Sequence, residues 1–425
     1  MRPARAPPWN CLPMSLVVQK YGGTSLADSE RIERVAHRVA RTKRSGNDVV
    51  VVVSAMGRQT DDLIALARQV SASPPAREMD MLLTAGERIS MALLAMALHD
   101  KGIPALSLTG PQAGILTDAA HGEAKITAIR GTRVGDGLAA GQVVIVAGFQ
   151  GVNPDSREIT TLGRGGSDAT AVALASAYSA AVCEIYTDVD GVYTADPRVA
   201  PDACKLDEVS FDEMLELAAG GAGVLMARSV EVGRKFNIPI HVRSSFVEDE
   251  GTWVKEKVME EAIISGIAHD TSEAKVTLRG VPDRPGVAAA IFEKLAGARV
   301  NVDMIVQNVG EDGCTDLSFT VPEAHVDIAR RATAELVGEL DAKGSAVDAD
   351  VGKVSLVGAG MRSTHGVAAR VFRALGDAGI NIEMISTSPI RISCVVNRGS
   401  VEDAVRALHA EFDPPVITAE VGADA

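Results

Sequence analysis

The sequence predicts an α/β domain built on a mostly parallel central sheet, followed by two smaller α+β domains. Two observations support this prediction. Between residues 16 and 243, buried-strand candidates such as Val49–Val53 and Val143–Ala147 alternate with helical stretches. Continuous apolar strands separated by helices are typical of parallel sheets that are covered on both faces. After residue 270, one pattern occurs twice in unbroken register, which indicates a duplicated domain.

The strands of the first domain follow one another with helices between them. The first strand is expected at Leu16–Gln19. Val49–Val53 and Val143–Ala147 each follow a helical segment that ends near a glycine, and Cys183–Thr187 follows an alanine-rich helix at Ala169–Ala181. Aromatic residues make up only 3% of the chain, so aliphatic residues and methionine must build the core.

The second half of the chain repeats itself at a spacing of 80 positions. The matched pairs include Gly286–Ala289 with Gly366–Ala369, Asn301 with Asn381, and Met304-Ile305 with Met384-Ile385. Each copy carries strand, helix, strand, strand, helix and strand signals. A unit of this length is too long for a solenoid repeat, so we expect a duplicated α+β domain at residues 271–350 and 351–425.

Composition excludes several classes of protein. The formal net charge of −14 argues against a general nucleic-acid or membrane-surface binder, which needs a cationic field. The five cysteines are scattered and form no C-x-x-C pair, so we expect a reducing cytoplasm and neither disulfides nor a zinc site. The eight histidines show no metal-ligand spacing, and no apolar run reaches the length of a membrane span.

Two segments fall outside the predicted domains. Residues 1–13 contain four prolines and two arginines but no apolar stretch. We therefore expect a disordered extension rather than a signal peptide, with the first domain at residues 14–246. Residues 247–270 include acidic clusters at 248–250 and 260–261, and this stretch is predicted to be a linker.

The first loop has the composition of a phosphate site. Lys20-Tyr21-Gly22-Gly23-Thr24-Ser25 follows the first strand directly. Two glycines let backbone N–H groups approach an anion closely, and Lys20 adds a mobile positive charge. The chain contains neither G-x-x-x-x-G-K-[ST] nor G-x-G-x-x-G, so the loop is neither a P-loop nor a dinucleotide fingerprint. The alternative interpretation is a glycine-rich turn between a strand and a helix.

A second loop, Thr160–Asp168, places three glycines and Arg164 ahead of the helix expected near Ala169. The free N–H groups of a helix N-terminus favour negative charge. Arg164 could hold a carboxylate or phosphate in a bidentate fork, and Ser167 and Asp168 are predicted to cap the helix. The alternative is a capped helix with a flexible loop.

Two further segments could carry binding groups. Thr187–Arg198 leaves the carboxyl end of a strand, where ligands bind in open α/β sheets, and Tyr193 and Pro197 could hold an adenine. Thr84–Ser90 begins a helical stretch, and Glu87 could pair with a substrate ammonium group. A surface turn and a glutamate that serves the helix dipole are the respective alternatives.

Together these segments resemble the aspartate kinases of the amino-acid kinase superfamily. The family's signatures occur here in the family's order, at Lys20–Ser25, Ser54–Gly57, Gly86–Arg88, Gly163–Asp168 and Thr187–Arg198. The duplicated unit resembles the family's tandem ACT domains. The resemblance covers the chain from Met14 onward and implies an amino-acid-kinase-type sandwich followed by two ferredoxin-like ACT domains.

The resemblance implies that ATP with Mg²⁺ donates its γ-phosphoryl group to the side chain of L-aspartate, as the first step of lysine, threonine and methionine biosynthesis. The implied catalytic residues are Lys20, Glu87 and Arg164. The implied aspartate pocket comprises Thr60, Glu87, Arg164 and Asp168. The implied ATP-binding residues are Lys20, Tyr21, Gly22, Gly23, Ser167, Thr187, Asp188, Tyr193 and Arg198.

The resemblance also implies feedback by lysine, threonine or both at the ACT domains. The implied effector-binding residues are Asp283, Gly286, Val287, Ala288, Asn301, Val302, Asp303, Gln307, Asn381, Ile382 and Ser388. The sequence departs from many relatives at Pro389, where they carry glutamate. Proline removes a backbone donor and fixes φ, so the resemblance leaves the choice of effector open.

The resemblance favours a homo-oligomer or an α2β2 assembly whose regulatory subunit starts internally near Met259, with no nucleic-acid or membrane partner. Two alternatives stay open. Another amino-acid or carbamate kinase of the superfamily would generally lack the tandem ACT pair. A non-catalytic ACT sensor would not need Lys20, Glu87 and Arg164, which are all present.

Overall fold

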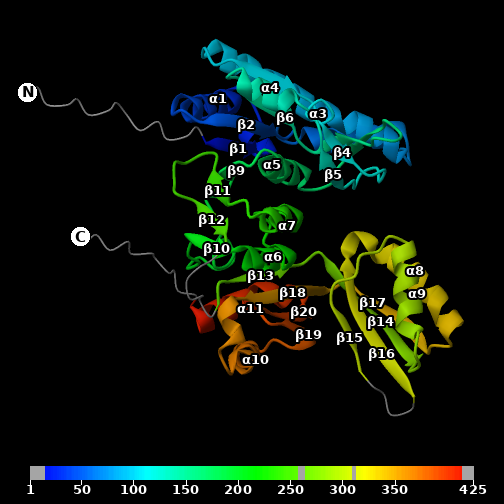
Figure 1. Ribbon diagram of the computed structural model, residues 1–425. Coiled ribbons are helices and arrows are strands. Elements are labelled where there is room, and N and C mark those ends of the chain that lie inside the picture. The colour runs from blue at the N-terminus through cyan, green and yellow to red at the C-terminus, as the bar shows by residue number, and fades with distance from the viewer. Residues whose placement is uncertain (1–14, 257–263, 309–312, 414–425) are drawn as a thin grey trace, which may run out of the picture. The chain divides into compact units, whose positions relative to one another are not determined.

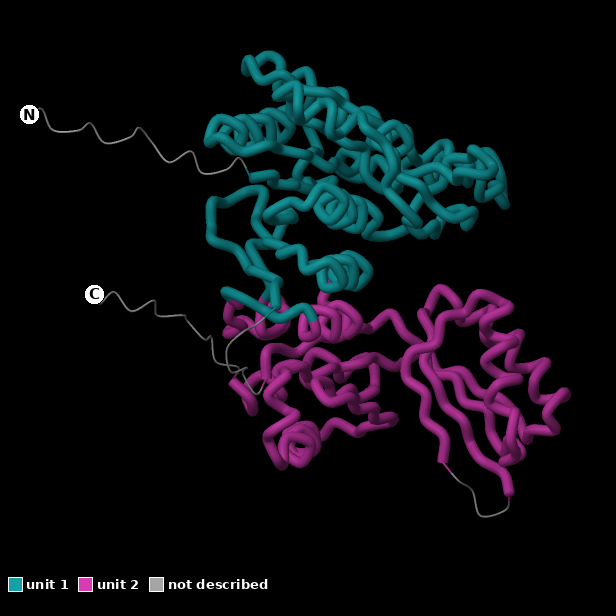
Figure 2. The backbone as a smooth tube through the Cα atoms, in the orientation of Figure 1, with its two compact units in different colours: residues 1–192, 207–211, 224–257 teal, residues 193–206, 212–223, 258–425 magenta. Residues whose placement is uncertain are grey.

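The computed structural model describes residues 15–256, 264–308 and 313–413. The extension expected at residues 1–13 and the internal start at Met259 lie outside these ranges. The chain divides into two compact units (Figure 2). The first comprises residues up to 192 together with 207–211 and 224–257, and the second comprises 193–206, 212–223 and the residues from 258 onward.

The first unit is built on an eight-stranded sheet with the strand order β10-β12-β11-β9-β1-β2-β6-β3. Neighbouring strands are parallel except β11 and β12, which are antiparallel. The prediction of a mostly parallel sheet is therefore confirmed. The strands are β1 (Leu16–Tyr21), β2 (Asp48–Val53), β3 (Ala105–Leu108), β6 (Val143–Ala147), β9 (Val182–Thr187), β10 (Glu208–Ser210), β11 (Ile240–Ser244) and β12 (Thr252–Lys255).

Helices cover both faces of this sheet (Figure 1). Helices α1 and α3 pack on one face and α5 lies on the other. Helix α1 begins after Asp28, whose carboxylate accepts a hydrogen bond from Arg31 N at 2.8 Å, and its buried residues recur at helical spacing from Ile32 to Ala40. The helices of this unit are α1 (Ser29–Arg44), α2 (Gln59–Val70), α3 (Ala76–Asp100), α4 (Arg133–Ala139), α5 (Gly166–Ala177) and α7 (Ala227–Phe236), whereas α6 (Phe211–Ala219) belongs to the second unit except for its first residue.

A second, smaller sheet in this unit has the order β5-β4-β7-β8. Its strands are β4 (Ile115–Thr117), β5 (Ile126–Ile129), β7 (Gln150–Val152) and β8 (Ile159–Thr161). Strand β8 packs against α3 and leads directly into the loop before α5. This sheet therefore joins the long helix to the glycine-rich loop at residues 162–165.

Helix α3 is, by length and composition, apolar enough to cross a membrane, and among the described residues it alone meets that test. Half of its apolar stretch is buried inside the structure. The helix also buries the carboxylates of Asp80 and Glu87. The buried half packs against strands of both sheets of this unit, whereas Met81, Ile89, Leu93 and Met96 are exposed.

The second unit contains the duplicated domain. The first repeat follows the predicted order with β14 (Glu273–Pro282), α8 (Val287–Gly297), β15 (Ile305–Gln307), β16 (Cys314–Pro322), α9 (Val326–Leu340) and β17 (Gly344–Asp348). The second repeat has β18 (Val351–Val357), α10 (Val367–Asp377), β19 (Ile382–Ser388), β20 (Arg391–Asn397) and α11 (Val401–Phe412). Short 3₁₀ helices lie at Gly23–Leu26 (η1), Glu323–His325, Ala359–Arg362 and Arg398–Ser400.

The second repeat obtains one of its strands from an unexpected place. Its sheet has the order β13-β18-β20-β19, and β13 (Gly266–Asp270) precedes the whole first repeat in the chain. The first repeat is thus inserted between β13 and β18. The segment predicted as a linker at 247–270 accordingly carries two strands, β12 in the first unit and β13 in the second.

The two repeats share a small apolar core. Met304 and Met384, which occupy equivalent positions, are both buried with Val351 and Val395. The 80-residue spacing therefore corresponds to two structurally matched halves that pack against each other.

Candidate active site

Within the first unit, the segments singled out in the sequence meet at one edge of the main sheet. Strands β1, β2, β6 and β9 run parallel, so their carboxyl ends lie at the same edge. Backbone hydrogen bonds join the segments that follow them: Gly22 N donates to Tyr186 O at 3.3 Å, Ser54 N to Tyr21 O at 3.1 Å, and Gly148 N to Val53 O at 3.0 Å. This edge is the candidate active site.

Lys20 and Asp168 form the central charge pair of this edge. Lys20 Nζ lies 2.6 Å from Asp168 Oδ1, and their side chains are 12% and 9% exposed. Lys20 belongs to β1, and Asp168 lies in the first turn of α5. Two segments separated by more than 140 residues are thereby fixed to each other.

Close backbone packing at this edge requires glycine. A Cβ atom on Gly23 would lie 2.8 Å from Gly57 O and 2.9 Å from Ala55 O, so any side chain there would force the loops after β1 and β2 apart. The tight approach leaves the two loops in direct contact, with Gly57 N donating to Gly23 O at 2.9 Å. The loop after β1 is the phosphate-cradle candidate predicted from the sequence, and the loop after β2 packs directly against it.

The start of α5 differs from the prediction. The residue that caps the helix is Gly165, with φ of +69°, and no side chain caps the helix. The prediction that Ser167 and Asp168 act as caps is wrong, because the left-handed glycine starts the helix at Gly166 and places both residues in the first turn. Asp168 there faces Lys20, and its negative charge suits the positive end of the helix dipole.

Glu87 is buried at the same edge. The residue is 3% exposed, and its Oε1 accepts a hydrogen bond from Ala55 N at 3.2 Å. Its Oε2 has no hydrogen-bond partner among the described residues. Burial raises the pKa of the carboxyl to about 7 because it disfavours the charged form. A cationic partner would therefore strongly stabilise the charged form of this carboxylate.

Thr60 and Arg164 lie on segments that border Glu87 and Asp168. Thr60 is half-buried in the first turn of α2, and the neighbouring Gln59 approaches Gly86. Arg164 is exposed, and its guanidinium has no ion pair within the described part of the chain. Arg164 is therefore available to bind an anion.

The predicted nucleotide residues are divided between the two units. Thr187 ends β9 in the first unit, and its hydroxyl donates to Asp188 Oδ1 at 3.0 Å. Tyr193 and Arg198 belong to segment 193–206 of the second unit. Arg198 Nη2 there forms an ion pair with Asp196 at 2.7 Å.

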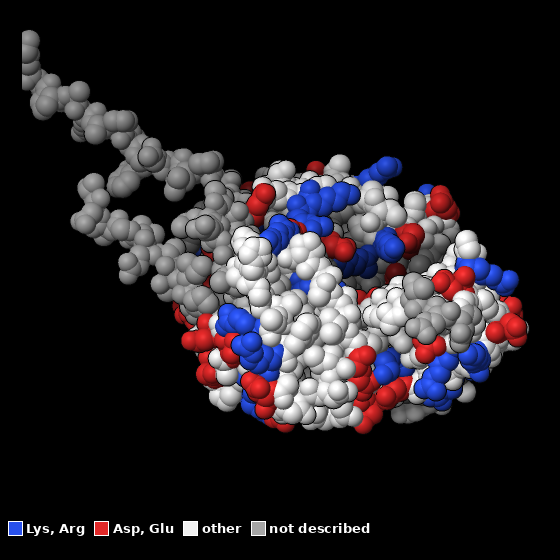
Figure 3. Space-filling model, turned by 90° about the horizontal axis from the view of Figure 1, so that it is seen from below, with Lys and Arg blue, Asp and Glu red and all other residues white. Residues whose placement is uncertain are grey.

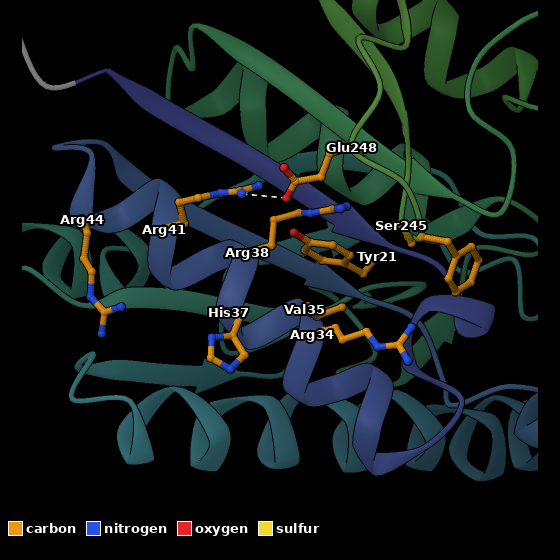
Figure 4. Close-up of a pocket in the computed structure, with 10 residues that line it drawn as sticks. Tyr21, Arg34, Val35, His37, Arg38, Arg41, Arg44, Ser245 and Glu248 are labelled. Atoms are coloured by element: carbon orange, nitrogen blue, oxygen red, sulfur yellow. Dashed lines mark hydrogen bonds and ion pairs between the residues drawn. The ribbon is translucent and has the colours of Figure 1, made fainter.

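The ring of Tyr21 is fully buried and stacks on Tyr186, with centroids 4.7 Å apart. Adjacent side chains of a strand point to opposite faces, so Tyr21 lies on the face opposite Lys20. Only the backbone of Tyr21 can contribute to a phosphate site beside Lys20. A cavity of about 480 Å³ on the Tyr21 side is lined mainly by α1, and Arg41 there is paired with Glu248 (Figure 4). It lies away from the Lys20–Asp168 pair.

The first repeat contains a cavity of about 320 Å³. Gly286 lines this cavity. It has a left-handed conformation with φ of +93° and is the N-cap residue of α8. The cavity is lined by five of the predicted effector residues, Asp283, Gly286, Val287, Ala288 and Gln307. Backbone N–H groups at the start of α8 provide donors that suit a carboxylate.

The remaining predicted effector residues lie elsewhere in the second unit. Asp303 Oδ2 is 2.6 Å from Lys353 Nζ, and the equivalent Glu383 pairs with Lys275. Ser388 donates to Glu216 Oε1 at 3.3 Å. Asn301 and Asn381 are exposed, and Val302 and Ile382 are half-buried, at the starts of equivalent segments.

Comparison with known proteins identifies the family of the chain. Residues 15–244 match the amino acid kinase family, and residues 276–335 and 354–412 match an ACT domain. The chain is 58% identical to the aspartokinase of Mycolicibacterium smegmatis over 94% of this chain and 96% of that protein. The chain belongs to the aspartokinase family. The aspartokinase of Corynebacterium glutamicum is 56% identical over the same shares of the two chains.

Solved aspartokinase structures share the fold. Escherichia coli aspartokinase III in complex with aspartate and ADP is 26% identical, with a TM-score of 0.80 over 94% of this chain and all of that chain. The same enzyme in complex with lysine and aspartate has a TM-score of 0.69 over 93% of this chain and 99% of that chain. The family resemblance seen in the sequence, the α/β fold and the ACT repeats are confirmed, and the chain is a kinase.

Proposed function

We propose that this aspartokinase transfers the γ-phosphoryl group of MgATP to the β-carboxylate of L-aspartate, which gives ADP and 4-phospho-L-aspartate. The observation that carries the proposal is the Lys20–Asp168 pair, which joins the phosphate-cradle loop of β1 to the anion-binding start of α5. The E. coli relative of the same fold is known in complex with aspartate and ADP. Mg²⁺ enters as part of the nucleotide substrate.

No general base is needed in this reaction. A β-carboxylate with an ordinary pKa near 3.9 is already ionised at neutral pH. The barrier instead arises from bringing two anions together while charge spreads over the transferred group. Lys20 and the N–H groups of the Gly22–Gly23 loop would offset this repulsion. Asp168 is bound to Lys20 and would orient that ammonium group.

Glu87 and Arg164 would recognise the amino acid. The free Oε2 of Glu87 is a buried acceptor, and a substrate ammonium group would satisfy it. The exposed guanidinium of Arg164 would bind the α-carboxylate in a bidentate fork. Thr60 borders the same edge and would add a hydroxyl donor. Holding both ends of aspartate would place its β-carboxylate in line with the γ-phosphate.

The proposal is tested by measuring ADP release and acyl-phosphate formation with purified protein, MgATP and L-aspartate. We expect both products, with L-asparagine inactive because it lacks the nucleophilic carboxylate. ADP release without acyl phosphate would overturn the proposal. L-Glutamate is the matched control for chain length, and turnover equal to that with aspartate would assign a different amino-acid kinase.

We also propose feedback control by lysine, threonine or both through the ACT repeats. The 320 Å³ cavity at the start of α8 offers Asp283 for an ammonium group and helix N–H groups for a carboxylate. The E. coli relative is known in complex with lysine. Such an effector inhibits only if it binds one conformation of the enzyme more tightly than the other.

Pro389, where many relatives carry glutamate, is exposed in the turn between β19 and β20.

The cellular setting forms part of the same proposal. The enzyme would catalyse the first step of lysine, threonine and methionine biosynthesis in the cytoplasm, as a homo-oligomer or with an internally started regulatory subunit. The described cysteines, Cys183, Cys204, Cys314 and Cys394, are free thiols. Basic and acidic side chains are interspersed on the face seen in Figure 3, whereas a nucleic-acid-binding surface gathers basic side chains on one face.

A further inference from the structure

Asp80 is a buried carboxylate outside the predicted site. It lies in the first half of α3 and is fully buried. His121 Nδ1 lies 2.6 Å from its Oδ2, and Gly122 N and Thr161 Oγ1 donate to its Oδ1 at 3.1 and 2.5 Å. Within the described residues, no lysine or arginine forms an ion pair with it. Three hydrogen bonds therefore offset the cost of burying this charge.

The donors to Asp80 come from two different segments. His121 and Gly122 belong to the β4–β5 loop (residues 118–125), and Thr161 ends β8. The two segments also bind each other directly, since Ala124 N donates to Thr161 O at 2.9 Å. Asp80 thus fastens both segments to α3.

Residue Thr161 is followed at once by the glycine-rich loop that carries Arg164. A Cβ atom on Gly163 would lie only 3.1 Å from Gly122 O, so the loop packs closely on the segment that Asp80 holds. Arg228 of α7 completes the attachment by donating to Leu162 O at 3.2 Å and to Ala124 O at 2.9 Å. The path of the Arg164 loop is therefore set by contacts on both sides.

Asp80 and Glu87 share one face of α3. They are separated by seven residues, which is two helical turns, and Thr84 lies between them on the same buried face. One rigid helix consequently carries Glu87 at the substrate edge and the carboxylate that anchors the Arg164 loop.

We propose that Asp80 is a positioning residue for the amino-acid substrate: through Thr161, His121 and Gly122 it sets the Arg164 loop at a defined distance from Glu87. The inference rests on the proposed roles of Glu87 and Arg164. A substrate held at both ends tolerates little change in the separation of its two binding groups. Asp80 therefore affects the KM for the amino acid indirectly, and it contacts neither the nucleotide nor the transferred group.

The test compares two matched substitutions in the small sheet. Thr161→Val removes one donor to Asp80 at nearly constant volume. Thr117→Val is the control, because Thr117 is equally buried in β4 and its hydroxyl pairs with Thr160 Oγ1 at 2.6 Å without contact to Asp80. Asp80→Asn is the direct variant, and Thr161→Val keeps the test valid if Asp80→Asn does not fold.

We expect Thr161→Val and Asp80→Asn to raise the KM for aspartate about tenfold, the effect of leaving one buried hydrogen-bonding group unpaired. The kcat and the KM for ATP should change less than about twofold. Thr117→Val should lower the melting temperature without changing the KM for aspartate. Equal values of this KM for Thr161→Val and Thr117→Val would overturn the inference. Failure of the wild-type protein to phosphorylate or bind aspartate would instead overturn the proposed function.

Discussion

Lys20 Nζ and Asp168 Oδ1 lie 2.6 Å apart, each on a nearly buried side chain. This pair joins the end of β1 to the start of α5, which are the two elements that offer backbone N–H groups to an anion. A phosphate that binds Lys20 must therefore share the ammonium group with Asp168. We therefore expect Asp168 to align the ammonium group of Lys20.

Lys20→Ala is expected to abolish detectable phosphoryl transfer, with kcat at least 10²–10³-fold lower, the usual range for loss of one transition-state donor. The substitution leaves the fold intact, although the unpaired Asp168 lowers the melting temperature. Steady-state kinetics and circular dichroism measure the two effects.

The matched control for this prediction is Lys43→Ala. Lys43 forms an ion pair of 2.9 Å with Asp48 at the opposite end of β2, and it is similarly buried. We expect its kcat to stay within about twofold of wild type. Near-normal turnover in well-folded Lys20→Ala would contradict the role given to Lys20.

Arg164→Ala should chiefly raise the KM for aspartate. Loss of a charge-assisted bidentate contact costs about 1.5–3 kcal/mol, which corresponds to roughly a 10- to 150-fold higher KM. The kcat should fall less. Arg133→Ala, at an exposed arginine that begins α4, is the control. A larger effect on kcat than on KM would mean that Arg164 acts on the phosphoryl group.

Aspartate binding should weaken in acid because of Glu87. Burial raises the pKa of this carboxyl to about 7, so it is largely charged at pH 8 and largely neutral at pH 6. If only the charged form pairs with the substrate ammonium group, the KM for aspartate rises about tenfold between these pH values. Glu87→Gln should have a high KM that does not vary over this range. Glu78→Gln, in the exposed first turn of the same helix, should keep the wild-type profile.

Glu87 should also affect the stability of the fold, and here a lower pH is favourable, whereas it weakens aspartate binding. A carboxyl whose pKa is raised in the folded state opposes folding once it ionises, so its cost is absent below pH 4.5 and complete above pH 7. The shift corresponds to a cost on the order of 3 kcal/mol. Glu87→Gln should therefore raise the melting temperature at pH 8 and leave it unchanged at pH 4.5. An equal melting temperature at pH 8 would show that the carboxylate is not desolvated.

The strands and the repeats could be predicted from the sequence pattern. The residues of the candidate active-site edge were predicted from motifs together with the family resemblance. Other features could not be predicted, and the structure explains why. The cap of α5 depends on the left-handed conformation of Gly165, which competes with two good capping residues nearby. Strand β13 pairs with β18, which is more than 80 residues away, and no local signal marks such a partner. No motif in the sequence marks Asp80, and only the fold brings Thr161 and His121 to it.

The predicted effector residues of the first ACT repeat form two separate groups in the structure. Gln307 and Asp283 line the cavity beside α8. Asp303 instead binds Lys353, whose side chain is 1% exposed and also contacts Glu273 at 2.5 Å. Burial lowers the pKa of Lys353, but the two carboxylates outweigh it and hold this pKa above its ordinary value. Asp303 therefore holds the two ACT repeats together.

Gln307→Ala and Asp303→Ala should both preserve the uninhibited kcat and weaken feedback by lysine or threonine, for different reasons. Gln307→Ala removes a contact made only with the bound effector, so the concentration for half-inhibition rises while the melting temperature stays the same. Asp303→Ala leaves a buried ammonium group with one carboxylate, so the melting temperature falls as well. Asn381→Ala tests the equivalent position of the second repeat and should also weaken inhibition. Dose–response curves for each amino acid, with thermal melts of the same samples, measure both effects. If neither amino acid inhibits the wild-type enzyme, or if all three variants respond as the wild type does, the regulatory proposal fails while the kinase assignment stands.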